Sequence, residues 1–384
     1  MNRFVAAGAT MLAVAMGVGR FAYTPLIPMM EHDMGLSVAM AGALATWNLI
    51  GYLAGASLAM HPVTHGVRLA IVRSSLVCVV ITTALMAGPQ ALWVPLRFLT
   101  GVSSGFVLVF ASSIVLERAA SARKPSWPPL YFSGVGLGIA FSGIAVPLLA
   151  GFGGSRAAWL GMAAFSAIAL FATASWFTEE APPASIAEAE VDVPVPPHRA
   201  AFVWLCVIYS AEAFIYIIPA TFLVAIVEGM PELSRYAALS WVFVGLAAAL
   251  ATFAWIPLAA AFGKARALAI ALAIQAIGIA APVWSHSALA VLLCAVALGG
   301  TFIAITLFAT AIGRDIFPKR TNAAVSRLTV LYSVAQIVGP IVATQLALRF
   351  GSYDPALAVA SVVAVAATAL SAATVRDRHL SPRA

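Results

Sequence analysis

Long apolar runs separated by short polar breaks organise most of this chain. A helix needs about 20 predominantly apolar residues to cross the ~30 Å hydrocarbon core of a bilayer. Strands are excluded at that depth because open edges would leave backbone groups unpaired in lipid, and a barrel would need short alternating segments. The pattern therefore predicts twelve membrane-spanning helices, over residues 4–30, 36–60, 67–87, 90–116, 128–151, 155–177, 200–228, 234–262, 265–284, 287–313, 321–350 and 354–375.

One polar segment interrupts the pattern near the middle of the chain. Residues 178–199 carry acidic side chains and prolines, and they contain no apolar run long enough to span a bilayer. Such composition is typical of a flexible linker. We therefore expect an N-terminal six-helix bundle over residues 1–177, a cytoplasmic linker over 178–199, and a C-terminal six-helix bundle with a short cytoplasmic tail over 200–384.

Lysine and arginine fall mostly on one side of the predicted helices. With the N-terminus placed inside, all but five of the 21 basic residues lie on the cytoplasmic side. The exceptions are Arg156, Arg235 and Arg349 on the outer side, and Arg20 and Arg97 within helices. This bias follows the positive-inside rule. It predicts a multi-pass protein of the bacterial inner membrane with both termini in the cytoplasm.

Short motifs recur in the two predicted halves, in the same order and at nearly constant offsets. The matching segments are Phe21-Ala22-Tyr23 with Phe214-Ile215-Tyr216, Trp47 and Gly51 with Trp241 and Gly245, Phe110-Ala111-Ser112 with Phe308-Ala309-Thr310, and Leu130-Tyr131 with Leu331-Tyr332. Four matches in order indicate a duplicated six-helix unit. In such proteins two bundles move around a binding site near the middle of the membrane.

Composition restricts the class of protein further. Hydrophobic residues make up 62% of the chain and charged residues only 9%, with a mean hydropathy of +1.00, whereas a soluble domain carries about a quarter charged residues. The net charge of +7 reflects topology, so no nucleic-acid partner is expected. Cys78, Cys206 and Cys294 lie in apolar runs, which argues against a disulfide framework, a zinc site or a redox pair. The first run contains Arg20 and is too long for a signal-peptide core, so we expect it to be retained.

Glu212 is the one acidic residue predicted well inside a helix, and no histidine lies near a helix centre. An ionisable side chain at that depth costs about 2.5–3.5 kcal/mol and marks a functional site by default. A carboxyl group in a low-dielectric cavity can bind and release a proton as access alternates. We therefore assign Glu212 to proton coupling. The structural alternative is a carboxyl group held by a hydroxyl or an arginine.

Arg20 and Arg97 are the basic residues predicted within helices. Arg20 could bind a substrate carboxylate or phosphate, or neutralise Glu212 in one conformation; the alternative is a fixed ion pair that orders the bundle. Arg97 lies a few residues below the predicted outer surface, where an arginine can also extend to the interface. Arg20 is therefore a candidate for substrate binding.

Aromatic and helix-distorting residues supply the remaining candidates. Candidates for substrate binding, which could instead pack against lipid or other helices, are Tyr23, Trp47, Tyr216, Trp241 and Tyr332. Candidates for helix kinks and gating are Pro25, Pro28, Gly138, Pro219, Gly339 and Pro340, because proline removes a backbone hydrogen bond and glycine permits close helix packing. The glycines at 134, 136 and 138 do not form a nucleotide loop, since no strand precedes them.

Four segments carry a resemblance to a known family. They are Gly19-Arg20-Phe21-Ala22-Tyr23-Thr24-Pro25 with Pro28, Tyr216-Ile217-Ile218-Pro219-Ala220-Thr221-Phe222-Leu223, Gly134–Gly138, and Gln336-Ile337-Val338-Gly339-Pro340. On these the chain resembles the major facilitator superfamily over nearly its whole length, and more narrowly its bacterial YbfB/YjiJ-type branch. The resemblance implies an all-α membrane protein with twelve transmembrane helices in two pseudo-symmetric six-helix bundles. Arg97-Phe98-Leu99-Thr100-Gly101 is similar to the helix-4 motif of proton-coupled exporters, which implies a role for Arg97 in proton coupling.

Two superfamily motifs match only in part. After the second predicted helix, Gly66 and Arg68 fit the pattern Gly-x-x-x-Asp-Arg-x-Gly-Arg, but Val63 stands at the aspartate position, and Ala260 does so after the eighth helix. We therefore expect the charge latch of that motif to be absent. The fifth helix also lacks the Gly-Pro pair of the antiporter motif, which argues against drug/proton antiport.

These features predict a secondary active transporter that uses a gradient, because no ATP-binding or catalytic motif appears. The leading hypothesis is proton-coupled transport of a small organic solute by rocking of the two bundles, with Glu212 binding the proton. The alternatives are a proton-independent organic-anion exchanger or uniporter centred on Arg20 and Arg97, and, more distantly, a membrane-embedded enzyme or non-transporting sensor. We expect no enzymatic activity, cofactor or metal. The expected partners are a small-molecule substrate, protons and the lipid bilayer, around a monomer.

Overall fold

The computed structural model describes residues 2–61, 63–64, 66–179, 199–317 and 321–376. Within these ranges the chain is helical and contains no strand. Twelve helical segments are long and apolar enough to cross a membrane, which confirms the all-α membrane fold predicted from hydropathy. Residues 180–198 of the expected linker and 377–384 of the expected tail lie outside the described residues.

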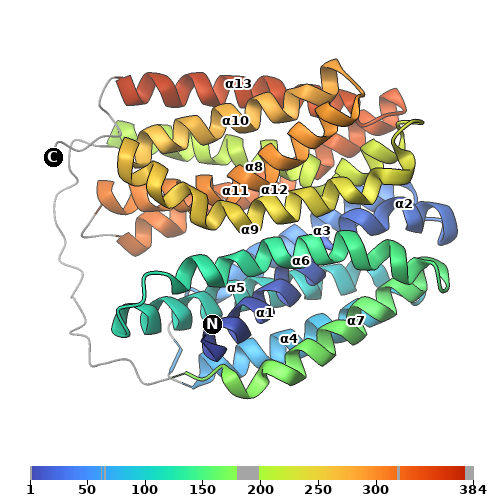
Figure 1. Cartoon of the computed structure of the whole chain (residues 1–384), viewed down its shortest axis with the longest axis horizontal. Helices are drawn as coiled ribbons and strands as arrows, with labels where there is room; N and C mark the ends of the chain where they lie inside the picture. The colour runs from blue at the N-terminus through green and yellow to red at the C-terminus, as the bar shows by residue number, and fades with distance from the viewer. Residues whose placement is uncertain (1, 62, 65, 180–198, 318–320, 377–384) are drawn as a thin grey trace.

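Six spans make up the N-terminal half. The first consists of three consecutive pieces, α1 (Arg3–Leu12), η1 (Ala13–Phe21) and α2 (Tyr23–Asp33). The other five are α3 (Val38–Leu58), α4 (Val67–Leu85), α5 (Trp93–Ser121, after the short turn η2, Gln90–Leu92), α6 (Trp127–Ala150) and α7 (Gly154–Thr173, followed by η3, Ala174–Trp176). Figure 1 shows them in blue and green below the C-terminal half.

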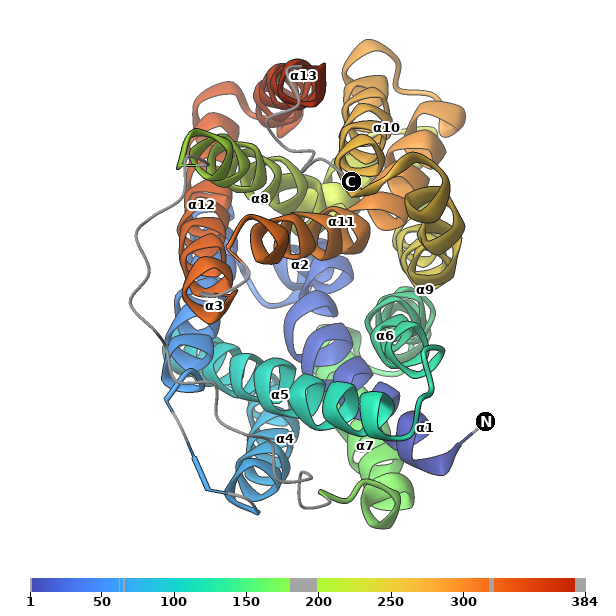
Figure 2. The ribbon, with the colours of Figure 1, turned by 90° about the vertical axis from the view of Figure 1, so that its left-hand side faces the viewer.

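The C-terminal half also contributes six spans. They are α8 (Arg199–Glu228), α9 (Ala237–Phe262, after the short turn η4, Ser234–Tyr236), α10 (Lys264–Trp284), α11 (Ala288–Ile316), α12 (Thr321–Phe350) and α13 (Asp354–Arg376). We call the end where α1 begins and α13 finishes the termini end, and the end with the α2–α3 turn the far end. Figure 2 views the bundle from the left-hand side of Figure 1, with the two groups of helices separated into a lower and an upper set.

Glycines and short polar side chains explain where several spans begin. Gly66 and Gly263 precede α4 and α10 at φ values of 83° and 81°, which a residue with a Cβ rarely adopts. They occupy equivalent places in the two halves. At the far end, Asp33 accepts a hydrogen bond of 2.6 Å from the backbone N–H of Ser155, and so caps the first turn of α7.

The two halves contact each other mainly along three helix pairs: α6 with α9, α3 with α12, and α2 with α8. Gly136 and Gly245 lie where the α6 and α9 backbones meet, so neither position has room for a Cβ. Gly42 of α3 lies against the side chain of Thr344 of α12 in the same way. The hydroxyl of Thr24 donates a 2.7 Å hydrogen bond to the carbonyl of Ala220. These contacts lie between the middle of the bundle and the far end, so the halves are joined there.

Candidate functional site

A small cavity lies between the halves, on the far-end side of Arg20. Its volume is about 20 Å³, enough for roughly one water molecule. It is lined by Arg20, Phe21, Tyr23, Thr24, Ala45, Asn48, Leu49, Arg97, Ile217, Ala220 and Thr221. Three spans of the N-terminal half and one of the C-terminal half therefore surround a single polar space.

Arg20 connects the two halves at this cavity. It is 7% exposed, and its Nη2 donates a 3.0 Å hydrogen bond to the hydroxyl of Tyr216 on α8. The guanidinium also lies 5.0 Å from the ring centre of Tyr52. Its Nε is buried without a hydrogen-bond partner among the described residues. The predicted ion pair with Glu212 is not formed in this conformation, because Arg20 binds the intervening tyrosine instead.

Arg97 is buried between α5 and the first span and is only 2% exposed. Its Nη1 donates a 2.9 Å hydrogen bond to the carbonyl of Gly19, and its guanidinium lies 4.5 Å from the ring centre of Tyr23. The side chain does not extend to the membrane surface, so the interfacial alternative is wrong. Arg97 lines the same cavity as Arg20.

Gly19, whose carbonyl accepts the hydrogen bond from Arg97, belongs to a widened helical stretch. η1 is π-helical, a wider coil than the α-helix and a form that often occurs at functional sites. Two side chains of α5 donate hydrogen bonds to the carbonyl groups of this stretch. Arg97 donates to the carbonyl of Gly19, and Ser104 donates to the carbonyl of Ala15 at 2.7 Å. Gly17 lies directly against the backbone of Gly138, which leaves no room for a side chain at either position. Packing from α5 and α6 thus stabilises the widened stretch that contains Arg20.

Glu212 lies deeper in the C-terminal half and is fully buried. Its Oε1 accepts a hydrogen bond from Nε2 of Gln275 on α10, at 3.4 Å. Oε2 of Glu212 and Oε1 of Gln275 are both buried without partners among the described residues. Glu212 does not line the cavity. The carboxyl group is therefore held by an amide and not, as one alternative supposed, by an arginine.

A layer of aromatic side chains separates Glu212 from Arg20. The ring of Tyr332 stacks on Tyr209 at 4.2 Å and on Tyr216 at 6.0 Å between centroids, and Tyr216 stacks on Phe302 at 5.5 Å. The Tyr332 hydroxyl lies beside the Glu212 carboxyl without forming a close hydrogen bond to it. Tyr216, which Arg20 contacts, also accepts a hydrogen bond from Gln336. The layer therefore connects the buried acid to the cavity through tyrosine hydroxyls.

The other aromatic candidates divide between this region and the surface. Tyr23 lines the cavity, and its hydroxyl donates to the carbonyl of Ala41. Trp241 is fully buried, with its ring centre 6.2 Å from that of Phe21. Trp47 is 41% exposed and packs edge-on against Phe98, away from the cavity. The adjacent residue on α3, Asn48, lines the cavity instead, and the assignment of Trp47 to substrate binding stays a prediction.

The helix-distorting candidates lie within spans. Pro28, Pro219 and Pro340 are inside α2, α8 and α12 respectively, and Pro25 lies in the first turn of α2. Gly339 of α12 faces Ile217 of α8. Their role in gating stays a prediction.

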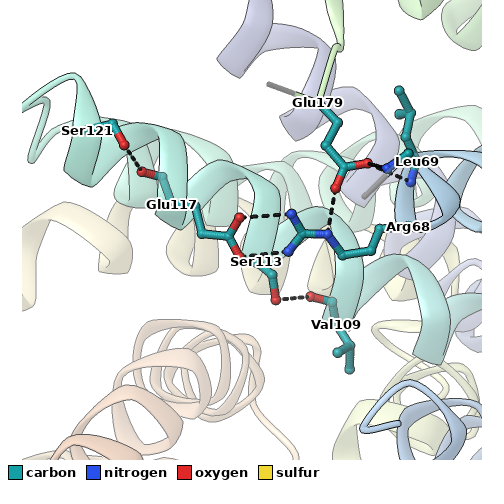
Figure 3. Close-up of polar contacts among 8 residues, drawn as sticks. Arg68, Leu69, Val109, Ser113, Glu117, Ser121 and Glu179 are labelled. Atoms are coloured by element: carbon teal, nitrogen blue, oxygen red, sulfur yellow. Dashed lines mark hydrogen bonds and ion pairs between the residues drawn. The ribbon is translucent and has the colours of Figure 1, made fainter. Parts of the chain in front are cut away.

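A charged cluster holds the termini end of the N-terminal half (Figure 3). Arg68 makes a bidentate ion pair with Glu117 of α5, at 2.7 and 2.9 Å, and a 2.6 Å ion pair with Glu179. Glu179 also accepts the backbone N–H groups of Gly66 and Leu69, so it caps α4. Arg68 is therefore in an ion-pair network although Val63 replaces the motif aspartate.

The C-terminal half repeats this arrangement in a simpler form. Lys264, at the start of α10, contacts Asp315 near the end of α11 at 2.6 Å. Both residues are exposed, so the pair contributes little on its own.

Several polar residues that line or surround the site were not among the site candidates named from the sequence. They are Thr24, Asn48, Thr221, Gln275, Ser333 and Gln336, all buried. Asn48 donates to the backbone carbonyl of Arg97 at 3.0 Å, which ties α3 to α5 at the cavity. An asparagine or glutamine within an apolar run is the sequence signal that would have identified Asn48, Gln275 and Gln336.

Comparisons with known proteins agree with this architecture. The family described as "Uncharacterised MFS-type transporter YbfB" matches residues 12–372. A search of curated proteins gave no match. Among solved structures, a mutant of the nucleoside transporter NupG is similar, with a TM-score of 0.76, 12% identity, and coverage of 97% of this chain and 99% of that one.

A second similar structure is a bacterial homologue of the human lysosomal transporter Spinster, in an inward-facing and unoccupied conformation. Its TM-score is 0.69 at 16% identity, with coverage of 97% of this chain and 96% of that one. At these identities the structural likeness shows the fold alone. The family match covers most of the chain and shows more: this multi-pass membrane protein belongs to the YbfB-type family of major facilitator transporters.

Proposed function

We propose that the protein is a proton-coupled secondary transporter of a small organic solute, in which Glu212 binds the coupled proton. The observation that carries this proposal is the pairing of Glu212 with Gln275. Nε2 of Gln275 donates to Oε1 of Glu212 at 3.4 Å, and the other oxygen of Glu212 and the single side-chain oxygen of Gln275 are both buried without a partner among the described residues.

A proton on Glu212 resolves this arrangement. A carboxylic acid and a primary amide can form two hydrogen bonds to each other, one in each direction, when the acid is neutral. An ionised carboxylate at this position would be fully buried with one long hydrogen bond and no arginine or lysine contact among the described residues. Burying an uncompensated charge is far more costly than burying a neutral acid. The environment of Glu212 therefore favours the protonated form in this conformation.

The tyrosine layer provides a physical link between protonation and solute binding. Arg20 belongs to the N-terminal half, whereas Tyr216, Tyr332 and Glu212 belong to the C-terminal half. When the halves separate around the cavity, the 3.0 Å contact from Arg20 to Tyr216 must break. The Tyr216 hydroxyl is then free to rearrange, and so is the Tyr332 hydroxyl beside Glu212. We infer that loss of the arginine contact changes the surroundings of Glu212, and that this couples the protonation state of the acid to the separation of the halves.

The conformation fits one stage of such a cycle. The contacts between the halves lie from the middle to the far end, through α6 with α9 and α3 with α12. The excess of lysine and arginine at the termini end supports a cytoplasmic location for that end. With that orientation, in the inner membrane of a bacterium, the structure is closed to the outside, and we assign it to an inward-facing state of a monomer.

Proton transport by purified protein in liposomes tests the proposal. Wild-type protein should move protons when a transported solute is supplied on one side, whereas Glu212→Gln, which mimics the neutral acid, should move solute without protons. Glu228→Gln is the matched control, because it removes a carboxyl group from the far end of the same helix. Unchanged solute-dependent proton movement in Glu212→Gln would remove this residue from the mechanism.

One alternative is supported by a separate observation. Arg20 and Arg97 line one cavity, and neither has a carboxylate partner among the described residues. Two such arginines at one cavity also suit proton-independent exchange of organic anions. That alternative requires exchange to be insensitive to a pH gradient in the wild type. The liposome experiment separates the two, since only the coupled mechanism moves protons.

A further inference from the structure

Two positive charges face the cavity without a negative charge to balance them. Arg20 and Arg97 are 7% and 2% exposed. In the described part of the chain, the residues that line the cavity include no aspartate or glutamate. Two like charges repel more strongly in a buried site than in water, because the effective dielectric constant is lower. The two arginines therefore disfavour each other's charge at this cavity.

The contacts of the two arginines do not neutralise them. Arg97 donates to the carbonyl groups of Gly19 and Leu44, at 2.9 and 3.5 Å, and Arg20 donates to a tyrosine hydroxyl. All of these acceptors are uncharged. Nε of Arg20 is buried and has no acceptor. A guanidinium group presents its donors in a planar fork that fits a carboxylate, so one donor and the charge of both residues are available to a ligand.

The size of the cavity restricts what can occupy it. A volume of about 20 Å³, enough for roughly one water molecule, accommodates one oxygen of a carboxylate but not a complete organic solute. The rest of such a ligand has to contact the side chains next to Arg20, and these walls are aromatic. The ring of Tyr52 lies under the guanidinium at 5.0 Å, and half-buried Phe302 packs against Phe21 and Tyr216. These walls suit an apolar body and offer it few hydrogen bonds.

We propose that Arg20 and Arg97 bind the carboxylate of the transported solute, and that the substrates are small organic monocarboxylates with an apolar body. This inference deepens the proposed transport function and rests on it. It concerns which solutes bind, however, so it is tested at equilibrium without any pH gradient. Failure of proton coupling would leave the binding result standing, and failure of binding would leave proton transport to be explained by another solute.

Calorimetric titration of the purified full-length protein in detergent provides the test, at constant pH and ionic strength. The probes are acetate and benzoate, their neutral isosteres acetamide and benzamide, and bromide as an inorganic anion. We expect benzoate to bind more tightly than acetate. The affinity of each carboxylate should exceed that of its amide by a factor of about ten or more, because charge-assisted hydrogen bonds are about twice as strong as neutral ones. Bromide should compete with benzoate, since both use the same charge.

Variants locate the site. Arg20→Gln should weaken benzoate binding about tenfold or more, whereas Arg20→Lys keeps the charge and should retain part of it. Arg349→Gln is the matched control, because Arg349 is an exposed arginine at the far end of α12. Should Arg20→Gln fail to fold, competition by bromide in the wild type still tests the charge requirement.

Three results would overturn the proposal. They are equal binding of benzoate and benzamide, unchanged benzoate affinity in folded Arg20→Gln protein, and binding of bromide without binding of either carboxylate. The last would indicate a site for an inorganic anion only.

Discussion

Replacing Gly245 with valine should shift the protein from the far-end-closed conformation toward one that is open at the far end. A Cβ at this position would collide with the backbone of Ala140 and Gly136 on α6. Backbone atoms cannot move aside as a flexible side chain does. The collision is between the two halves of the molecule, so separating the halves relieves it without unfolding either one.

The magnitude follows from the cost of overpacking. Inserting methyl groups into a well-packed contact costs about 1–3 kcal/mol, and here the cost falls only on the closed state. A free-energy difference of about 1–3 kcal/mol changes the ratio of two conformations by about 5- to 150-fold. A protein that is mostly closed at the far end would become substantially open there.

Spin-label distances measure this shift. In a background without the native cysteines, labels at Phe152 and Glu232 report the far end, because each lies in a turn of a different half. Labels at Lys124 and Ala261 report the termini end. In Gly245→Val the first distance should lengthen and the second shorten.

Gly55→Val is the matched control. A Cβ at Gly55 would collide with the backbone of Val102, but both helices belong to the N-terminal half. This variant should lower thermal stability and leave both distance distributions unchanged. Equal distances in wild-type and folded Gly245→Val protein, or the same shift in Gly55→Val, would refute the reasoning.

Three further variants test individual contacts by thermal unfolding in detergent. Arg68→Gln removes the ion pairs with Glu117 and Glu179 and should destabilise the protein by about 1–3 kcal/mol; an unchanged melting temperature would show that the cluster is not structural. Asp33→Ala removes the cap of α7 and should cost about 0.5–2 kcal/mol, so a gain in stability would contradict the capping role. Arg97→Lys keeps the charge but loses the fork that binds the widened helix, and should cost about 1–3 kcal/mol; a neutral effect would argue that charge alone matters there.

Hydropathy predicted the twelve spans because a bilayer demands about 20 apolar residues for each crossing, whatever the side-chain detail. It did not predict the π-helical stretch Ala13–Phe21, which depends on contacts from Arg97 and Ser104 of a distant helix. Buried glycines such as Gly17 are compatible with that form but do not specify it.

The site was only partly predictable, for reasons of helix rotation and partner choice. Arg20, Arg97 and Glu212 stood out because charge is rare in apolar runs. Hydropathy cannot determine which face of α3 points inward. The sequence therefore suggests the exposed Trp47 as a substrate-binding candidate and does not indicate its buried neighbour Asn48. The partner of the buried acid, on α10, could not be named either, because contacts between helices distant in sequence are not encoded in local patterns.

Infrared difference spectroscopy measures the protonation state of Glu212 directly. Subtracting the spectrum of Glu212→Gln from that of wild-type protein, both in lipid at neutral pH and without solute, isolates the contribution of this carboxyl group. We predict a carbonyl stretch of a neutral carboxylic acid in the difference spectrum, shifted when Gln275 is replaced by leucine. A difference spectrum with only the symmetric and antisymmetric bands of a carboxylate would contradict the proposal that this buried acid carries the proton.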